Sequence, residues 1–393
     1  MISKLNLCSM KEGWEIKKLG EVCEIINGFA FKSQLFKEDG DDILRISNIQ
    51  NGVIDINDIA HFSKDDYPKV NFEKYAVLPN DIVVALSGAT TGKFGINNTG
   101  KKLYLNQRVA ICREKTSDIH HLFLLYFLQT QSKSFLDSAS GVAQPNLSTE
   151  QMKQYNIPVP PLGEQERIVG ELDCLSGVIE KKKEQLKDLD LLAQSIFYEM
   201  FGNPVENDRG WEVKTIGDVC VLKSGDSSAN NTSEGTLPYI KVGDMNMEEN
   251  IPYITTSSTF VSKSENIKGI FPIGTTIFPK RGGAIYTNKK RMTVVEICCD
   301  LNTMGVIPMN DVLPLYIYYY FVLLDFAELC NGATIPQINN KDIAPLKVCV
   351  PPLSLQQEFA SKIEAIEKKK ELIRKSIEEV EMLFNSRMDY YFG

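Results

Sequence analysis

Histidine is scarce in this chain of 393 residues: His61, His120 and His121 leave few candidates for metal binding or acid–base catalysis. The nine cysteines are odd in number and are never spaced as C-x-x-C, so neither a disulfide framework nor a zinc site is expected. The longest uncharged apolar stretch spans residues 312–324 and contains a proline, which makes it too short to cross a bilayer. No secretory signal pattern is present. We therefore expect a cytoplasmic protein with no membrane contact.

Motifs of enzyme active sites are also missing. The loop Ser87–Phe94 resembles a phosphate-binding loop, but its spacing is one residue short and Phe94 stands where a Mg²⁺-binding hydroxyl would be. There is no G-x-G-x-x-G after a strand, no nucleophile elbow and no H-E-x-x-H. His120 and His121 open a helical segment without a spaced carboxylate, which favours a capping or surface role. We expect no catalytic residue, no metal and no cofactor in this chain.

What the sequence does contain is a long internal repeat. Residues 13–23 (GWEIKKLGEVC) return as residues 210–220 (GWEVKTIGDVC), and Gly28 then matches Gly225. Leu105–Asn106 then matches Leu301–Asn302, and Gly141–Leu162 matches Gly332–Leu353, at slowly falling offsets. Ser87–Phe94 has Arg281–Asn288 as its repeat partner. A period of about 190 residues is far too long for a solenoid, so it indicates a duplicated domain followed by a tail.

Each Pro-Pro-Leu is followed by a proline-free segment whose apolar residues alternate at spacings of four and three. A seam sustained over about five heptads favours a coiled coil, and the presence of both helices in one chain favours intramolecular pairing. A long amphipathic helix packed on its own domain is the alternative. Lys182 and Lys370 also fall on the seam, either as register devices or as solvated breaks. The seam residues are Ile168, Leu172, Leu175, Ile179, Leu186, Leu189, Ile196, Phe359, Ile363, Ile366, Ile373, Ile377, Val380 and Phe384, with Ala193, Met200, Arg387 and Tyr391 continuing the spacing.

The globular portions are predicted to be mixed α and β. Short β-rich runs at residues 81–86 and 275–278 alternate with Gly/Asn/Asp turns, and each unit has one aromatic helix, at residues 122–129 and 315–326. The fold class is therefore α+β: two similar mixed α/β domains, each followed by a long helix, in an internal repeat. The expected domains are residues 1–161 and 203–352, and the expected helices lie within residues 162–202 and 353–393.

The net charge of −8 argues weakly against nucleic acid, but its distribution changes that interpretation. Residues 164–209 hold eleven acidic and six basic side chains, so most of the acidic excess lies in one connecting segment, while the globular portions are near neutral. Glycine-rich loops carrying basic and amide side chains suit phosphate contact and base-edge hydrogen bonding. Ordinary solvated surface is the alternative. The candidate DNA-binding residues are Lys93, Lys101, Lys102, Arg108, Lys280, Arg281, Lys289, Lys290 and Arg291.

Taken together, the two G-W-E segments, the G-A-T-T-G-K loop at residues 88–93, the P-x-P-P-L before the first helix and the F-G-N-P-V at residues 201–205 resemble the specificity subunit of type I restriction-modification systems. The resemblance covers Gly13 to Gly393. It implies two target-recognition domains separated by two long antiparallel helices that form a coiled coil, so that the halves are related by a pseudo-two-fold axis. Each domain would read half of a bipartite, asymmetric site in double-stranded DNA, and the helices would set the spacer and dock two methyltransferase subunits. Restriction subunits would join in the full complex. S-adenosylmethionine, ATP and Mg²⁺ would belong to those partners.

Two other function classes were weighed against this one. A coiled-coil scaffold carrying two domains for partners other than nucleic acid would share the repeat and the helices, but it would not capture DNA by sequence. An enzyme of unknown kind would be revealed by an activity of the purified chain. The second repeat has no Gly-Lys pair at the position of Gly92–Lys93, which leaves a shared role for Lys93 open.

Overall fold

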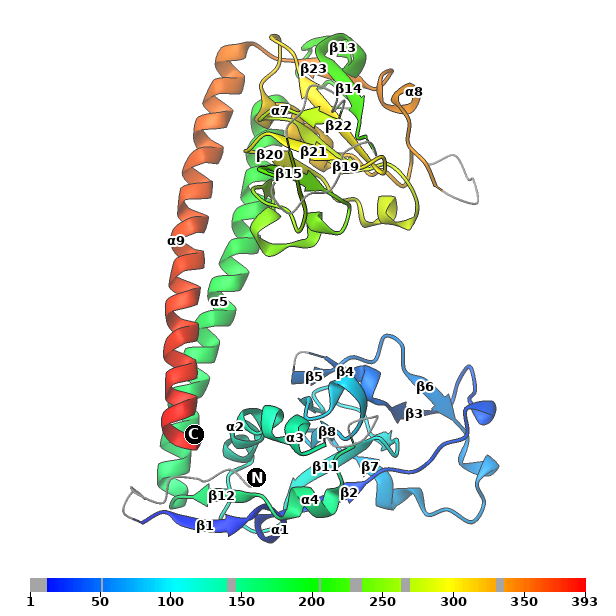
Figure 1. Cartoon of the computed structure of the whole chain (residues 1–393), viewed down its shortest axis with the longest axis vertical. Coiled ribbons are helices and arrows are strands. Elements are labelled where there is room, and N and C mark those ends of the chain that lie inside the picture. Colours follow the sequence, from blue (N-terminus) through cyan, green and yellow to red (C-terminus); the bar gives the residue numbers. More distant parts are fainter. Residues whose placement is uncertain are drawn as a thin grey trace. The chain divides into compact units, whose positions relative to one another are not determined.

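The computed structural model describes residues 13–50, 52–139, 146–204, 206–226, 235–262, 269–329 and 336–393. The chain divides into two compact units. The first contains residues 1–181 and 376–393, and the second contains residues 182–375. Each unit therefore holds one globular domain together with a segment of each long helix. The two units are described separately below (Figure 1).

The globular domain of the first unit is built on two curved sheets and a short ribbon. One sheet has the order β2-β11-β8-β9-β5-β4, the other has the order β6-β3-β10-β7, and β1 pairs with β12 in the ribbon. The strands are β1 (Glu15–Lys18), β2 (Cys23–Asn27), β3 (Asp41–Leu44), β4 (Ile49–Gln50), β5 (Gly52–Ile54), β6 (Ala60–Phe62), β7 (Ala76–Val77), β8 (Ile82–Ala85), β9 (Phe94–Ile96), β10 (Leu103–Leu105), β11 (Val109–Glu114) and β12 (Asn156–Val159). The helices are α1 (Leu19–Val22), α2 (His121–Thr130), α3 (Ser132–Ala139) and α4 (Thr149–Lys153).

The domain of the second unit repeats this arrangement. Its larger sheet has the order β14-β22-β19-β20-β16, its smaller sheet β17-β15-β21-β18, and β13 pairs with β23. The strands are β13 (Glu212–Thr215), β14 (Cys220–Ser224), β15 (Leu237–Ile240), β16 (Tyr253–Ile254), β17 (Phe260–Val261), β18 (Ile270–Phe271), β19 (Thr276–Pro279), β20 (Arg291–Thr293), β21 (Ile297–Cys299), β22 (Thr303–Pro308) and β23 (Lys347–Val350). The helices are α6 (Ile216–Val219), α7 (Pro314–Leu323) and α8 (Asn340–Ile343).

Strand order and backbone contacts confirm the predicted internal repeat and the α+β class, and they correct one detail of the sequence match. The backbone N–H of Phe29 donates to the carbonyl of Leu105, as that of Asp226 donates to Cys299, both at 2.8 Å. Leu105–Asn106 therefore corresponds to Cys299–Asp300. The match with Leu301–Asn302 was wrong: this identical Leu-Asn pair lies two residues after the structurally equivalent position.

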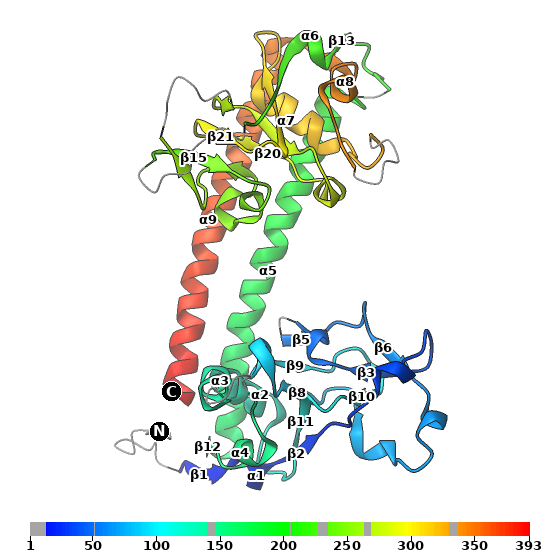
Figure 2. The same cartoon turned by 45° about the vertical axis from the view of Figure 1, so that its right-hand side comes forward.

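Two 40-residue helices, α5 (Leu162–Phe201) and α9 (Leu353–Phe392), follow the domains. In the first unit, Glu171 of α5 accepts a hydrogen bond from Tyr391 at 2.6 Å and pairs with Arg387 at 2.7 Å. In the second unit, Asp190 of α5 pairs with Lys370 at 2.6 Å. Arg167 also contacts Tyr391 in the first unit, and Phe197 packs on Phe359 in the second. Within each unit, residue numbers therefore rise on one helix as they fall on the other, and the helices pack antiparallel (Figures 1 and 2).

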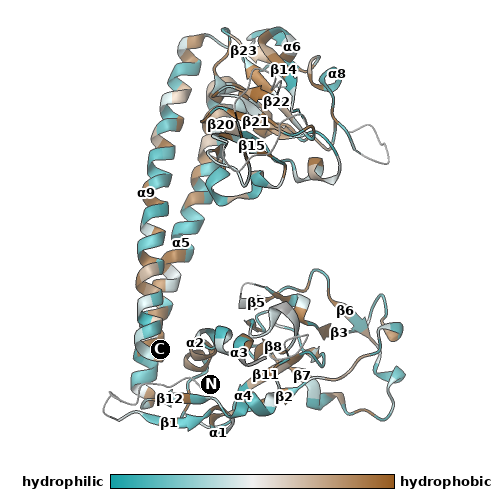
Figure 3. Ribbon diagram, in the orientation of Figure 1, coloured by the Kyte–Doolittle hydropathy of each residue, from teal (hydrophilic) through white to brown (hydrophobic). Residues whose placement is uncertain are grey.

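The apolar residues of both helices recur as a stripe along otherwise hydrophilic ribbons (Figure 3). Nine of the fourteen seam residues are buried: Ile168, Leu172, Ile179, Leu189, Phe359, Ile363, Ile366, Ile373 and Ile377. The other five are partly buried: Leu175, Leu186, Ile196, Val380 and Phe384. Toward the C-terminal end of each helix Ala193 and Tyr391 are buried as the spacing predicts. Other buried side chains lie one position later than predicted: Phe197 and Phe201 on α5, and Met388 and Phe392 on α9.

A buried glutamine fixes each helix start to the domain before it. Gln165 donates from Nε2 to the carbonyls of Asp118 and Pro160, both at 2.8 Å, and its Oε1 accepts from the N–H of His120 at 2.7 Å. Gln356 makes the same three bonds in the second unit, to Asp311 (3.2 Å), Pro351 (2.9 Å) and Leu313 (2.8 Å). Both side chains are fully buried. We name these two residues the helix clamps.

Candidate nucleic-acid interface

In the first domain, polar side chains gather where β8 ends. The N–H of Leu86 donates to the carbonyl of Arg108, and that of Ala85 donates to the carbonyl of Lys93. Lys93 and Arg108 therefore lie on either side of the end of β8. Ser87 forms an isolated bridge with Asn146 at the same end. Lys93, Arg108 and Asn146 are exposed, and neither Lys93 nor Arg108 forms an ion pair within the described ranges. We call Ser87, Lys93, Arg108 and Asn146 rim 1.

The second domain has an equivalent set where β19 ends. The N–H of Lys280 donates to the carbonyl of Asn302, and Arg281 bridges Gln337, which matches the two contacts of rim 1. Lys289 is the counterpart of Lys93, because Val83 pairs with Gly95 as Ile277 pairs with Arg291, and each lysine lies two residues before the second member of its pair. Arg281 and Asn302 are exposed, and Lys289 and Gln337 are half-buried. We call Arg281, Lys289, Asn302 and Gln337 rim 2.

Lys93 and Lys289 each follow a residue with a left-handed backbone. Gly92 has φ +82° and Asn288 has φ +52°, and asparagine is, after glycine, among the residues that tolerate this region best. The Gly-Lys pair that the second repeat lacks in sequence is therefore present in structure as Asn-Lys. This removes the reason for treating Lys93 as peculiar to the first domain.

The two rims share a frame but not their side chains. Ser87 corresponds to Arg281 and Arg108 corresponds to Asn302, so the side chains differ at these positions. Lysine occupies the third position in both domains, as Lys93 and Lys289. Asn and Gln amides and Arg guanidinium groups are the side chains that read base edges, and lysine is suited to phosphate. Sequence analysis found the four basic members and missed Ser87, Asn146, Asn302 and Gln337, whose only signal was their place in the repeated segments.

Lys101 and Lys102 lie away from β8, in the turn that leads into β10. Lys102 pairs with Glu73 at 2.6 Å, and this contact raises the pKa of Lys102 and lowers that of Glu73. Lys101 lies 3.8 Å from Asp42. Acidic neighbours compensate both charges, so the structure does not bring these two residues together with Lys93 and Arg108 in one basic cluster.

Three of the sequence candidates are engaged inside the second domain. Lys280 takes the place of buried Leu86 and donates to Ser224 Oγ at 2.7 Å. Lys290 donates to the carbonyl of Leu324 at 2.6 Å and lies over the ring of Phe326, and desolvation lowers its pKa to about 8. Arg291 donates to the carbonyls of Met245 and Lys290, and burial lowers its pKa. The structure gives all three an internal role, which corrects the expectation that they form a surface cluster with Arg281 and Lys289.

No cluster of His, Cys, Asp and Glu suited to a metal ion occurs among the described residues. Of the histidines, His121 contacts Glu114 at 3.0 Å, and His120 occupies the N-cap position of α2. Within the same described ranges, no helix combines the length and apolar character needed to span a membrane.

Comparison with known proteins agrees with this geometry. Residues 11–189 and 208–382 each match the family "Type I restriction modification DNA specificity domain". Among curated proteins, the putative type I restriction enzyme MjaX specificity subunit of Methanocaldococcus jannaschii is 24% identical over 96% of this chain and 92% of its own length. The EcoAI specificity subunit of Escherichia coli is 34% identical over 45% of this chain, and the match spans only 31% of that relative.

Two solved structures share the fold. A chain from a study of complex assembly and conformational transition of the type I R-M system has a TM-score of 0.60 at 20% identity and covers 98% of both chains. The crystal structure of the type I restriction-modification S subunit from M. genitalium has a TM-score of 0.50 at 16% identity, covering all of this chain and 98% of the other. The duplicated domain, the two divergent polar rims and the paired helices define a protein with two similar recognition domains. This chain belongs to the type I restriction-modification DNA specificity family.

Proposed function

We propose that this chain is the DNA sequence-recognition subunit of a type I restriction-modification complex, and that each globular domain reads one half of a bipartite, asymmetric DNA site. The observation that carries the proposal is the pair of rims, which keep one frame and one lysine but differ at their other positions. Phosphate contacts position a protein on DNA irrespective of sequence, whereas base contacts specify. The shared lysines suit the first task, and the divergent residues suit the second.

A selection experiment tests the assignment directly. The assembled complex methylates a library of sites with both halves randomised, and the modified sequences are read. Arg108→Ala should relax one position of one half-site, and Arg281→Ala one position of the other, each by about 1–3 kcal/mol of discrimination. A variant that changed both half-sites equally, or neither, would contradict the assignment of one rim to each half.

Lys93→Ala and Lys289→Ala should behave differently from the arginine variants. Each should weaken binding to all sequences alike and reduce the magnitude of the salt slope by about one. Lys101→Ala is the matched control, because its charge is already balanced by Asp42. The near-neutral domains also lead us to expect weak DNA binding by the chain alone and much tighter binding once methyltransferase subunits are added. Equal affinity in the two titrations would count against this part.

Two methyltransferase subunits are the proposed partners, with restriction subunits in the full complex. The helices offer two equivalent exposed apolar pairs: Leu191 (62% exposed) and Leu192 (46%) on α5, and Met382 (64%) and Leu383 (46%) on α9. Exposed apolar groups of this kind mark sites of protein contact. Two copies of the pair suit two copies of one partner. Replacing each pair by glutamines, one at a time, should reduce the bound methyltransferase subunits from two to one.

The chain itself is proposed to catalyse no reaction. S-adenosylmethionine, ATP and Mg²⁺ are assigned to the partner subunits, and the proposed place of action is the cytoplasm. The helices are proposed to set the spacer, since a 40-residue helix is about 60 Å long. Inserting one heptad into both helices should change the spacer length selected in the methylation assay. If the half-site sequences changed instead, the spacer role would be wrong.

A further inference from the structure

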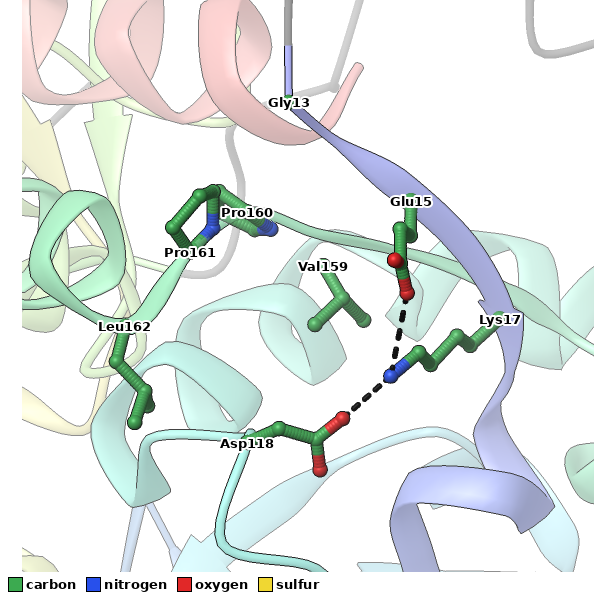
Figure 4. A pocket seen from close by; sticks show the side chains of 8 residues that line it. All are labelled: Gly13, Glu15, Lys17, Asp118, Val159, Pro160, Pro161 and Leu162. Atoms are coloured by element: carbon green, nitrogen blue, oxygen red, sulfur yellow. Dashed lines mark hydrogen bonds and ion pairs between the residues drawn. The ribbon is translucent and has the colours of Figure 1, made fainter.

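A cleft of about 270 Å³ lies beside the start of α5 in the first unit (Figure 4). Eight residues line it: Gly13, Glu15, Lys17, Asp118, Val159, Pro160, Pro161 and Leu162. The Lys17 ammonium lies between two carboxylates, hydrogen-bonded to Asp118 and 3.4 Å from Glu15. We call this set cleft set 1.

The second unit carries the same eight residue types at the equivalent positions. They are Gly210, Glu212, Lys214, Asp311, Val350, Pro351, Pro352 and Leu353, which we call cleft set 2. The strand register is the same, because Glu15 pairs with Val159 as Glu212 pairs with Val350. Lys214 lies 2.8 Å from Asp311 and 3.8 Å from Glu212. In both sets the aspartate contact raises the pKa of the lysine, so each ammonium stays charged.

Identity at all eight positions contrasts with the rims and with several neighbouring positions of the same two strands. Between the same strands, Ile16 is replaced by Val213, Lys18 by Thr215 and Pro158 by Cys349. Part of the identity has a folding reason: Gly13 and Gly210 have φ +84° and +70°, which favours glycine. The exposed members have no such reason.

The members with large exposed areas are Glu15 and Asp118 with their counterparts, and Leu162 and Leu353, whereas Lys17 and Lys214 are half-buried. The glutamates are 71% and 66% exposed, and the aspartates are 44% and 57% exposed. Surface ion pairs of this kind contribute little to stability. Both leucines leave 42% of their area in water. Fold stability therefore does not account for the presence of the same charged and apolar groups in both halves, whereas a shared binding partner does.

The chemistry of the sets selects the kind of partner. Two carboxylates around one ammonium give a net negative charge, which repels phosphate and therefore disfavours DNA. Carboxylates next to Pro-Pro and an exposed leucine suit a cationic side chain with an apolar neighbour, as on a protein surface. Because the two half-sites differ but the two sets do not, the partner is one that binds this chain twice in the same way.

We infer that each cleft set is a docking point for one methyltransferase subunit, which places a basic side chain against the exposed oxygens of the glutamate and the aspartate and packs an apolar residue on the leucine. This inference rests on the proposed function and names a contact by which that partner is held. It gives the sets a role distinct from the rims: the rims differ so that two half-sites are read, and the sets agree so that one kind of subunit is bound twice.

The test measures how many methyltransferase subunits of the same system the full-length chain binds, by native mass spectrometry and by titration. Glu15→Gln with Asp118→Asn alters set 1, and Glu212→Gln with Asp311→Asn alters set 2. Each double variant should raise the dissociation constant of one of the two bound subunits at least tenfold and leave the other unchanged. All four substitutions together should raise both. Glu24→Gln is the matched control, because Glu24 is exposed and its counterpart is Val221.

A charge exchange separates docking from a structural tie. Lys17→Asp with Asp118→Lys keeps an ion pair between the same two positions but moves the carboxylate and the ammonium. If the pair only ties β1 to the segment before α2, this variant should bind two subunits like the wild type, and the inference would be overturned. If it docks a subunit, one subunit should be lost although the melting temperature is unchanged. Loss of DNA affinity by the variants without added subunits would also overturn it.

The failures of the two proposals are distinguishable. If the wild-type chain binds no methyltransferase subunit and captures no DNA with one present, the proposed function itself is wrong. If the wild-type chain binds two subunits and every cleft variant also binds two with unchanged dissociation constants, only the docking inference is wrong.

Discussion

Lys370 of α9 lies in the apolar seam of the second unit with 1% of its side chain exposed, and its ammonium is 2.6 Å from the carboxylate of Asp190 on α5. Glu367, one turn earlier on α9, lies 2.7 Å from the same ammonium. The equivalent position on α5 is Ile179, which is also buried. Lys182, the other seam lysine, is only half-buried. The buried charge of Lys370 favours a single register, because any slip separates the ammonium from Asp190.

The two carboxylates should substitute for each other. Asp190→Ala and Glu367→Ala should each lower the free energy of unfolding by about 1 kcal/mol, since one partner remains. The double variant leaves a buried ammonium unpaired and should lose about 3–5 kcal/mol, more than the two single losses combined. Urea unfolding followed by circular dichroism measures all three, and adding Lys370→Met to the double variant should restore most of the loss. Strict additivity would show that the ammonium is not held by both carboxylates.

Gly28 and Gly225 should be equally intolerant of a side chain. A Cβ atom on Gly28 would overlap the carbonyl oxygen of Asn106, and one on Gly225 would overlap that of Asp300. Backbone atoms cannot move aside cheaply, so each Gly→Ala change should cost at least about 3 kcal/mol in unfolding free energy. Gly243→Ala is the control, because nothing lies near its Cβ position and its φ of −63° suits alanine. Equal stabilities for Gly28→Ala and Gly243→Ala would refute the close strand approach.

The helix clamps predict a local effect. Gln165→Leu leaves three buried backbone groups without a partner and should cost about 2–4 kcal/mol, with faster hydrogen exchange at the His120 amide. Gln356→Leu should do the same at the Leu313 amide. Glu166→Leu and Gln357→Leu are the neighbouring controls, since both side chains are exposed. If exchange at His120 and Leu313 is unchanged in the variants, the glutamines do not hold the helix starts.

The spacing of apolar residues predicted most of the helix seam correctly and failed near the C-terminal end of each helix. Spacings of four and three select the buried residues from Ile168 to Leu189. At the C-terminal end they select Ile196 and Met200, whereas Phe197 and Phe201 are buried. A straight α-helix has 3.6 residues per turn, so a strict 3.5-residue repeat drifts by about 20° per heptad unless the helices supercoil. After several heptads that drift amounts to one residue, and the same shift brings Met388 rather than Arg387 into the core.

The site was less predictable than the helices for a different reason. The search for basic residues near a repeated loop identified Lys93, Arg108, Arg281 and Lys289 as candidate DNA-binding residues. It also identified Lys280 and Lys290, which are buried in the fold. Whether a lysine is exposed depends on neighbours far away in sequence, such as Ser224 for Lys280 and Phe326 for Lys290. The equivalence of Lys93 and Lys289 was equally hidden, because an asparagine supplies the backbone conformation that glycine supplies in the first repeat.

Lys290 gives a pH dependence of stability with a defined sign. Desolvation lowers its pKa from 10.5 to about 8 in the folded protein, so between these values the unfolded chain binds more protons at this position than the folded chain. Stability should therefore rise with pH from about 8 to 10.5, and the burial penalty, about 3 kcal/mol at most, is fully present below pH 8. Lys290→Met should remove this rise, while Lys289→Met, at a half-buried neighbour, should keep it. Urea midpoints at pH 7, 9 and 10.5 measure the difference, and parallel pH profiles for wild type and Lys290→Met would contradict the lowered pKa.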